Sequence, residues 1–252
     1  MDMREAMTPS EPSLSLVMPA FNEQATILEA VARVLEQPFV AELIIVDDAS
    51  TDGTADLIAT IDDPRVIALR HSHNQGKGAA LRTGFARAST AYIGIQDADL
   101  EYHPADYARL LVPLQNGSAD VVYGSRFLTS DAHRVLFFWH SVGNKILTLM
   151  SNAASNVNLT DMETCYKVFR REWIQSITIE ENRFGFEPEI TIKLARRGAR
   201  MYEAGISYSG RNYEDGKKIN WKDGVSAVRC IVKYGMSERR KRGSRAPLPA
   251  RH

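Results

Sequence analysis

Three carboxylates, Asp97, Asp99 and Glu101, lie within one five-residue segment of the chain. Carboxylates at this spacing repel one another unless protons or a cation neutralise them, and Mg²⁺ and Mn²⁺ prefer oxygen ligands. A cation held here would keep coordination positions for substrate phosphates. The alternative interpretation is an acidic turn, in which an aspartate caps the helix opened by Pro104. The residue types favour a site for Mg²⁺ or Mn²⁺.

The acidic segment follows residues 91–96, an apolar run that is typical of a buried strand. Earlier apolar runs at residues 14–18, 42–46 and 65–69 are also followed by polar sequence that packing does not require, at residues 19–23, 46–54 and 74–84. Each polar segment alone is compatible with a helix cap and a turn. Because ligands bind at the carboxyl edge of the strands in open α/β sheets, the four segments together predict one binding site.

Two common nucleotide-binding motifs are absent from these segments. The run Gly76-Lys77-Gly78 looks like a phosphate-binding loop, but His71 stands where G-x-x-x-x-G-K-[ST] has its first glycine, and Gly78 stands where it has Ser or Thr. The segment after the first strand lacks G-x-G-x-x-G, which argues against a dinucleotide-binding domain. The remaining interpretation is a metal-dependent site for a nucleotide diphosphate of another kind.

Apolar residues at helical spacing separate the predicted strands, so strand and helix alternate along the chain. This alternation predicts a mostly parallel sheet with right-handed crossovers. The pattern continues with a helix over residues 104–115 and a strand over 119–123, and then with helices over 139–154, 187–197 and 221–234 and strands over 166–169 and 201–206. The predicted class is α/β, with helices flanking one sheet in a single domain over residues 13–236. Residues 1–12 and 237–252 are expected to be disordered.

Composition excludes several classes of function. The 252 residues include 31 Lys or Arg and 31 Asp or Glu, so the chain has no general attraction to nucleic acid. Cys165 and Cys230 have neither metal-site nor redox spacing, which is typical of a reduced cytoplasmic protein. No charge-free apolar run approaches the roughly 18 residues that a spanning helix needs. Residues 237–252 contain six Lys or Arg and one Glu, a net charge of +5 that would attract anionic lipid.

Taken together, the polar segments resemble those of family-2 glycosyltransferases with the GT-A fold. They read Pro-Ala-Phe-Asn-Glu (19–23), Val-Asp-Asp-Ala-Ser-Thr-Asp-Gly-Thr (46–54), Gly-Lys-Gly (76–78) and Asp-Ala-Asp-Leu (97–100). Within that family the chain is similar to the dolichyl- and polyprenyl-phosphate sugar synthases over about residues 14–234. The resemblance implies Mg²⁺ or Mn²⁺ as cofactor. It also implies inverting transfer of a hexose from a donor of the UDP-glucose or GDP-mannose type to a polyprenyl or dolichyl phosphate.

The resemblance also implies roles for individual residues. Those expected to bind the donor nucleotide are Pro19, Ala20, Phe21, Asn22, Glu23, Asp48, Gly76, Lys77, Asp97 and Ala98. The expected metal ligands are Asp97, Asp99 and Glu101, and the expected catalytic residues are Asp99 and Arg126. Arg126, Arg211 and Lys217 would bind the acceptor phosphate, for which a planar guanidinium is well suited.

Two segments depart from the pattern of the family. Many relatives carry Gln in place of Glu101. Many also carry Ser/Thr-Gly-Phe-Arg where this chain has Thr164-Cys165-Tyr166-Lys167. In the relatives this second segment lines the sugar pocket, which gives Asp161 and Thr164 a weaker assignment to that role.

The nature of the acceptor decides whether a catalytic base is required. A lipid phosphate is already anionic and needs none, whereas a hydroxyl acceptor needs a carboxylate, for which Glu187, Glu189 and Asp161 are the candidates. One alternative function is therefore a glycosyltransferase for a soluble or glycan hydroxyl. Another is a non-catalytic module that binds nucleotide sugar or scaffolds a complex. The sequence leaves the oligomeric state open.

Apolar residues gather at 135–139 and again at Ile146, Leu147, Leu149 and Met150, on the helix expected there. They fit either core packing or an interfacial helix beside a lipid tail, with residues 237–252 adding attraction to anionic lipid. The second interpretation predicts a peripheral protein in the cytoplasm, at the inner face of the cytoplasmic membrane.

Overall fold

The computed structural model describes residues 13–128, 138–210 and 221–240. The first half contains β1 (Leu14–Ala20), α1 (Ile27–Leu35), β2 (Val40–Asp47), α2 (Thr54–Ala59), β3 (Val66–Arg70), α3 (Lys77–Arg87) and β4 (Tyr92–Ile95). The second half contains the 3₁₀ helix η1 (Pro104–Asp106), α4 (Tyr107–Gln115), β5 (Val121–Ser125), α5 (Phe138–Ser155), β6 (Lys167–Arg170), α6 (Arg171–Ser176), α7 (Phe186–Arg196), β7 (Met201–Gly205) and α8 (Trp221–Arg240). The predicted alternation of strand and helix is confirmed.

Within the described ranges, all the strands join one sheet of seven in the order β3-β2-β1-β4-β6-β5-β7. The pairs β1–β2, β1–β4, β2–β3 and β5–β7 are parallel. Strand β6 is antiparallel to both of its neighbours, with Gly94 of β4 and Val122 of β5 both opposite Val168. The mostly parallel α/β sheet is therefore confirmed, with one reversed strand, β6, in its interior.

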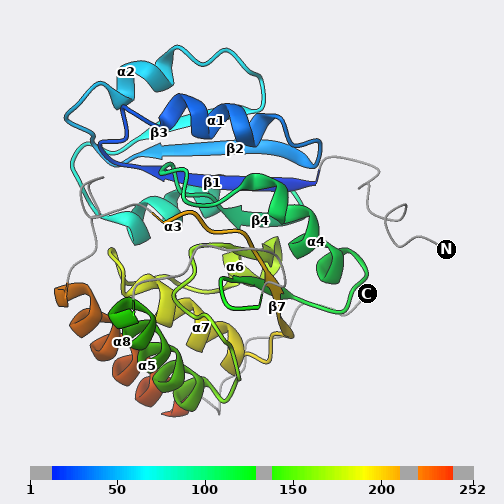
Figure 1. Cartoon of the computed structure of the whole chain (residues 1–252), viewed down its shortest axis with the longest axis vertical. Coiled ribbons are helices and arrows are strands. Elements are labelled where there is room, and N and C mark those ends of the chain that lie inside the picture. Colours follow the sequence, from blue (N-terminus) through cyan, green and yellow to red (C-terminus); the bar gives the residue numbers. More distant parts are fainter. Residues whose placement is uncertain (1–12, 129–137, 211–220, 241–252) are drawn as a thin grey trace.

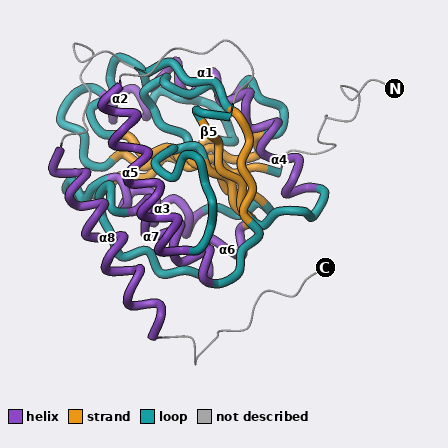
Figure 2. Tube along the Cα trace, turned by 60° about the horizontal axis from the view of Figure 1, so that its bottom comes forward, coloured by secondary structure: helices purple, strands orange, loops and turns teal. Residues whose placement is uncertain are grey.

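Helices cover both faces of this sheet (Figures 1 and 2). Side chains alternate across a strand, so Leu16 and Met18 of β1 enter one core with apolar residues of α1, α2 and α4. Val17 enters the other core with residues of α3, α6, α7 and α8. On that face Gly84 of α3 lies so close to β1 that an added Cβ would overlap the Val17 side chain. Close helix–sheet packing fixes where α3 begins, and so fixes the loop before it.

Two details differ from the sequence expectation. The short helix α6 was not predicted, and α8 continues to Arg240 instead of ending at Tyr234. Within the described residues, every helix falls short of the combination of length and apolar character needed to cross a bilayer. Residues 237–240, which the sequence analysis placed in a disordered tail, belong to α8, so that prediction is wrong for them. Residues 1–12 and 241–252 lie outside the described residues, and there the prediction of disorder stays a prediction.

Candidate active site

The predicted site residues follow strands that run in the same direction and therefore meet at one edge of the sheet. Pro19 and Ala20 end β1, and Asn22 and Glu23 follow in the loop. Asp48 follows β2, Gly76 and Lys77 open α3, Asp97 to Glu101 follow β4, and Arg126 follows β5. Arg211 and Lys217 lie outside the described residues, as do residues 135–137 of the apolar cluster.

The loops after β1 and β2 are linked by hydrogen bonds. The Asn22 backbone N–H donates to Ser50 Oγ at 3.0 Å, and Asn22 Oδ1 accepts from the Thr51 backbone N–H at 2.8 Å. The Glu23 backbone N–H donates to Thr54 Oγ1 at 2.9 Å. The segment predicted to hold the donor nucleotide is therefore braced by the loop after β2.

Asp48 organises the loop that precedes α3. Its Oδ1 accepts from the Gln75 backbone N–H at 2.9 Å and lies 2.7 Å from His71 Nδ1, while Oδ2 accepts from the Gly76 N–H at 2.6 Å. Gly76 has φ of +98°, and a Cβ on it would overlap the Asn182 carbonyl oxygen. Only glycine fits this position, so Gly76 has a conformational role whether or not it touches a ligand.

Backbone strain is concentrated at the same edge. Asn22, Ala49 and Leu100, which follow β1, β2 and β4, have φ values of 54°, 60° and 64°. The left-handed region is unfavourable for Ala and for Leu, and strained residues persist only where the surrounding structure holds them. Such residues cluster at functional sites, which supports the assignment of this edge.

Lys77 joins the loop before α3 to the acidic segment. Its Nζ lies 2.6 Å from Asp97 Oδ1 and donates to Cys165 Sγ at 3.0 Å. Burial, the largest influence, acts to raise the pKa of Asp97, but the Lys77 charge and hydrogen bonds from Cys165 and Lys77 bring that pKa below its ordinary value. Asp97 is therefore an ionised carboxylate with a protein cation already beside it.

Asp99 lies in a different electrostatic environment. Burial, followed by the negative charges of Asp97 and Glu101, raises the pKa of Asp99 from 3.8 to about 7. Its Oδ1 accepts from the Glu101 backbone N–H at 3.1 Å, and Glu101 Oε2 accepts from the Tyr208 hydroxyl at 3.0 Å. Unlike Asp97, which lies beside Lys77, Asp99 is the carboxyl group whose negative charge is opposed by its surroundings.

The three predicted metal ligands do not form a ready-made cage. Among the described residues, no three His, Cys, Asp or Glu side chains converge on one point. The chemistry of the donor set nevertheless fits a divalent cation, because the repulsion that raises the pKa of Asp99 is relieved by positive charge placed between these carboxylates. Closing the site on an ion would require Asp97 to share its carboxylate with Lys77.

Arg126 is held by Asp161, a residue from a distant part of the sequence. The guanidinium donates Nε and Nη2 to the two Asp161 carboxylate oxygens, each at 2.7 Å, and lies over the Tyr208 ring at 5.2 Å. Asn144 Nδ2 of α5 also donates to Asp161, at 2.9 Å. This bidentate geometry fixes the Arg126 side chain at the carboxyl end of β5, which is where the sequence predicted an acceptor-binding cation.

The two glutamates considered as bases for a hydroxyl acceptor are also paired. Glu187 bonds Lys167 Nζ, and Glu189 bonds Lys193 Nζ at 2.6 Å. Asp161, the third candidate, is occupied by Arg126 as described. A fourth carboxylate, Glu163, was not singled out from the sequence, although its position two residues after Asp161 was a signal that could have drawn attention to it.

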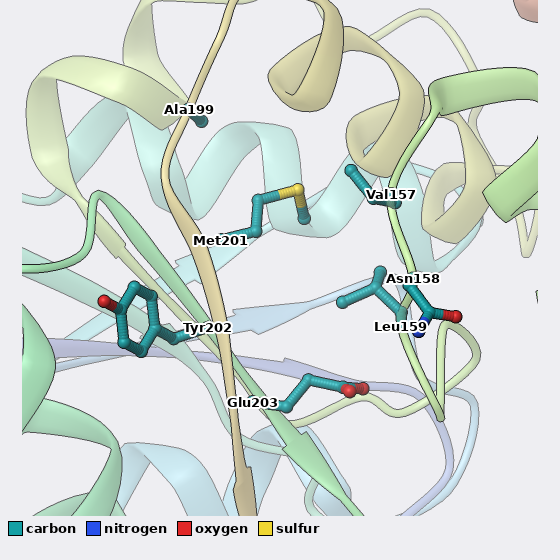
Figure 3. A pocket seen from close by; sticks show the side chains of 7 residues that line it. All are labelled: Val157, Asn158, Leu159, Ala199, Met201, Tyr202 and Glu203. Atoms are coloured by element: carbon teal, nitrogen blue, oxygen red, sulfur yellow. The ribbon is translucent and has the colours of Figure 1, made fainter.

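A cavity of about 330 Å³ lies away from the acidic segment, beside β7 (Figure 3). It is lined by Val157, Asn158, Leu159, Ala199, Met201, Tyr202 and Glu203. Glu203 points toward the segment that carries Asn158 and Leu159, and its carboxylate accepts from the backbone N–H groups of Thr160 at 2.8 Å and Asp161 at 3.2 Å. Glu203 therefore holds the backbone of Thr160 and Asp161 in place. The cavity is not part of the site.

Comparison with known proteins agrees with this architecture. The model of Glycosyl transferase family 2 matches residues 15–178. The undecaprenyl-phosphate mannosyltransferase of Micrococcus luteus is 28% identical over 88% of this chain and 94% of its own length. The undecaprenyl-phosphate 4-deoxy-4-formamido-L-arabinose transferase of Proteus mirabilis is 29% identical over 81% of this chain, which spans 62% of that longer protein.

Among solved structures, glucosyl-3-phosphoglycerate synthase from Mycobacterium tuberculosis, in complex with Mn²⁺, UDP and phosphoglyceric acid, has the same fold. Its TM-score is 0.69 at 20% identity, over 89% of this chain and 79% of that chain. The match of the family model to well over half of the chain is consistent with the acidic segment, the glycine-rich loop and the sheet order. The chain belongs to glycosyl transferase family 2 and is a glycosyltransferase with the GT-A fold.

Proposed function

We propose that the protein transfers a hexose from a nucleotide-diphosphate sugar to a polyprenyl phosphate. The observation that carries the proposal is the arrangement at the sheet edge, where the acidic segment after β4 lies with the Asp48-braced loop and with Arg126 after β5. The relatives from Micrococcus luteus and Proteus mirabilis, whose names specify undecaprenyl phosphate, support the acceptor class. The hexose itself, of the glucose or mannose type, is the expectation from the sequence.

On the donor side, the loop bound by Asp48 and the segment after β1 would hold the nucleotide. Lys77 would face the diphosphate, because its ammonium already lies at the acidic segment. Asp99, with Asp97 and Glu101, would hold Mg²⁺ or Mn²⁺. When bound, that cation would supply positive charge to the leaving nucleoside diphosphate.

On the acceptor side, Arg126 would position the phosphate of the lipid. A phosphate oxygen attacks the anomeric carbon, the new carbon–oxygen bond forms, and the bond from that carbon to the diphosphate breaks. The attacking oxygen is already anionic, so no residue has to remove a proton. The pairing of Glu187, Glu189 and Asp161 with cations supports this acceptor over a hydroxyl, since none of the three carboxylates is available as a base without losing its partner.

We further propose that α5 and α8 contact the lipid surface. These helices pack against each other in the lower layer of Figure 1 and present exposed apolar side chains. The exposed residues are Phe138, Trp139, Ile146 and Leu149 on α5, and Val225, Val228, Val232 and Met236 on α8. Trp139 is 78% exposed and Leu149 69% exposed, so they do not serve the core. An apolar stripe on each of two adjacent helices fits a peripheral protein at the inner face of the cytoplasmic membrane.

A transfer assay tests the acceptor and the donor together. Purified protein is incubated with polyprenyl phosphate and a panel of UDP- and GDP-sugars, with Mg²⁺ or Mn²⁺ or with chelator. We expect metal-dependent formation of an acid-labile lipid sugar phosphate, lost in Asp99→Ala and retained in Asp56→Ala, whose side chain is exposed on α2. Transfer to a soluble hydroxyl acceptor without lipid product would contradict the proposal and favour the alternative acceptor.

The membrane contact is tested separately by cosedimentation with vesicles of anionic phospholipid. The double variant Leu149→Ser and Val232→Ser should bind vesicles less than the wild type does. Val112→Ser is the matched control, because Val112 is also an exposed apolar residue but belongs to α4 on the opposite face of the sheet. Equal loss of binding in the control, or no loss in the double variant, would exclude this surface.

A further inference from the structure

The segment from Asp161 to Cys165 spans the site from one side to the other. At one end Asp161 binds Arg126, the cation assigned to the acceptor. At the other end Cys165 accepts from Lys77, whose Nζ also contacts Asp97 on the donor side. A sugar in transit between a leaving diphosphate and an attacking phosphate must lie between these two sides. Glu163 is the middle residue of this segment.

Glu163 differs from the carboxylates around this segment. Its Oε1 atom is buried and has no hydrogen-bond partner among the described residues. The backbone on both sides of it is fixed, since Lys167 Nζ donates to the carbonyl oxygens of Met162 and Thr164. Buried polar atoms are normally satisfied, so an unsatisfied one in a well-braced segment indicates a partner that arrives with a ligand.

A second buried oxygen, on the Asn144 side chain that binds Asp161, also has no partner in the described part of the chain. Asn144 donates Nδ2 to Asp161, but its Oδ1 is unsatisfied. Asn144 is therefore bonded directly to Asp161, and Glu163 follows Asp161 by two residues in the chain. Two unsatisfied oxygens call for a ligand that donates hydrogen bonds.

The charge around Glu163 restricts the chemistry of that ligand. Burial, followed by the negative charge of Glu187, raises the pKa of Glu163 to about 7, with Asp161 adding to the effect and Lys167 and Arg126 opposing it. A carboxyl group in this state both accepts and donates hydrogen bonds near neutral pH. A phosphate placed against it would be repelled by Glu187 and Asp161, whereas a hydroxyl group matches both of its functions.

We propose that Glu163, with Asn144, hydrogen-bonds hydroxyl groups of the transferred sugar. Through these hydrogen bonds the enzyme binds the sugar nucleotide more tightly than the bare nucleotide. The inference rests on the proposed function, because the reacting group of a lipid phosphate has no hydroxyl and the sugar is then the only hydroxyl-bearing group between the two sides. Glu163 is a specificity-determining residue in this scheme and takes no part in bond breaking.

The test compares binding of UDP-glucose with UDP, and of GDP-mannose with GDP, by calorimetry on the full chain without acceptor. The variants are Glu163→Met, which keeps the size of the side chain but forms no comparable hydrogen bond, and Glu163→Gln, which can still donate and accept. The relevant pair is the sugar nucleotide that the wild type binds more tightly than its bare nucleotide. The ratio of these two affinities should fall by about tenfold in Glu163→Met, as expected for the loss of one buried hydrogen bond. Glu163→Gln should keep most of the ratio, and affinity for the bare nucleotide should stay unchanged.

Glu172→Met is the matched control, because Glu172 is exposed on α6 and should leave every affinity as in the wild type. An unchanged ratio in Glu163→Met would overturn the inference, and so would a wild type that binds sugar nucleotide and nucleotide equally. An unchanged ratio combined with lost transfer to a hydroxyl acceptor would make Glu163 a base instead. Transfer to polyprenyl phosphate by the wild type, measured in parallel, shows whether the proposed function stands when the inference fails.

Discussion

Replacing Asp99 with Asn should stabilise the metal-free protein above neutral pH. Burial, then the charges of Asp97 and Glu101, hold the pKa of Asp99 at about 7, against 3.8 for an ordinary aspartate. Because the folded-state pKa is raised, the contribution of Asp99 to stability is complete below pH 3.8 and is lost as the pH rises through about 7. The neutral amide of Asp99→Asn avoids this loss.

The size of the effect follows from the width of the pH window. Each unit between the two pKa values corresponds to about 1.4 kcal/mol, so the full loss is at most about 4 kcal/mol. For a domain of this size, such a difference corresponds to a rise in Tm of roughly 5–15 °C. The advantage of Asp99→Asn over the wild type should grow steadily from about pH 4 to about pH 7 and then level off.

Thermal unfolding in chelator, repeated across this pH range, measures the difference. Asp97→Asn is the matched control from the same segment, because the pKa of Asp97 is lowered by Lys77 despite its burial. The contribution of Asp97 is therefore present above the ordinary pKa and lost as the pH falls, and removing its charge should destabilise the protein at neutral pH. Millimolar Mg²⁺ should raise the Tm of the wild type more than that of Asp99→Asn. A difference between Asp99→Asn and the wild type that does not change with pH would refute the electrostatic reasoning.

Three further substitutions, together with one control in α5, test the contacts around the site. Lys77→Met should lower the free energy of unfolding by about 3–5 kcal/mol, as measured by urea denaturation, because it leaves the buried Asp97 charge without its partner. Gly78→Ala should cost about 1–3 kcal/mol, since the new Cβ overlaps a backbone carbonyl oxygen, whereas Gly143→Ala in α5 meets open space and should gain about 1 kcal/mol by the same measurement. Arg126→Lys should cost about 1.5–3 kcal/mol in unfolding experiments and slow transfer, because the bidentate contact is lost.

The order of the elements could be predicted because each one leaves a local pattern in the sequence. Apolar runs marked the strands, helical spacing marked α1 and α3, and parallel topology placed the polar loops at one edge. The antiparallel position of β6 between β4 and β5 could not be predicted, since the pairing of Gly94 with Val168 joins segments far apart in the chain. Helix α6 has only six residues, too few to show a helical period.

The candidate site was predictable to the extent that its residues follow strands. The positions of Asp97, Asp99 and Arg126 at the sheet edge were predicted in this way, and their roles stay predictions. Their partners were not, because the pair Lys77–Asp97 and the pair Arg126–Asp161 each join two loops that only the folded sheet brings together. Glu163 lies in a loop without periodicity, and it became a candidate only when the neighbouring carboxylates proved to be paired and its own Oε1 did not.

Among the residues that the structure describes, the charge balance at the sheet edge supports a divalent cation independently of any motif. Lys77, Arg126 and Lys167 each form an ion pair with a protein carboxylate, so these three cations and their partners contribute no net charge. Asp99 and Glu101 add negative charge to this neutral set. Taking a cation from its partner to bind a diphosphate would leave a buried carboxylate unpaired, at a cost of about 3–5 kcal/mol. A donor that enters with its own divalent cation avoids that cost, and the same argument requires the acceptor phosphate to compete with a carboxylate for Arg126.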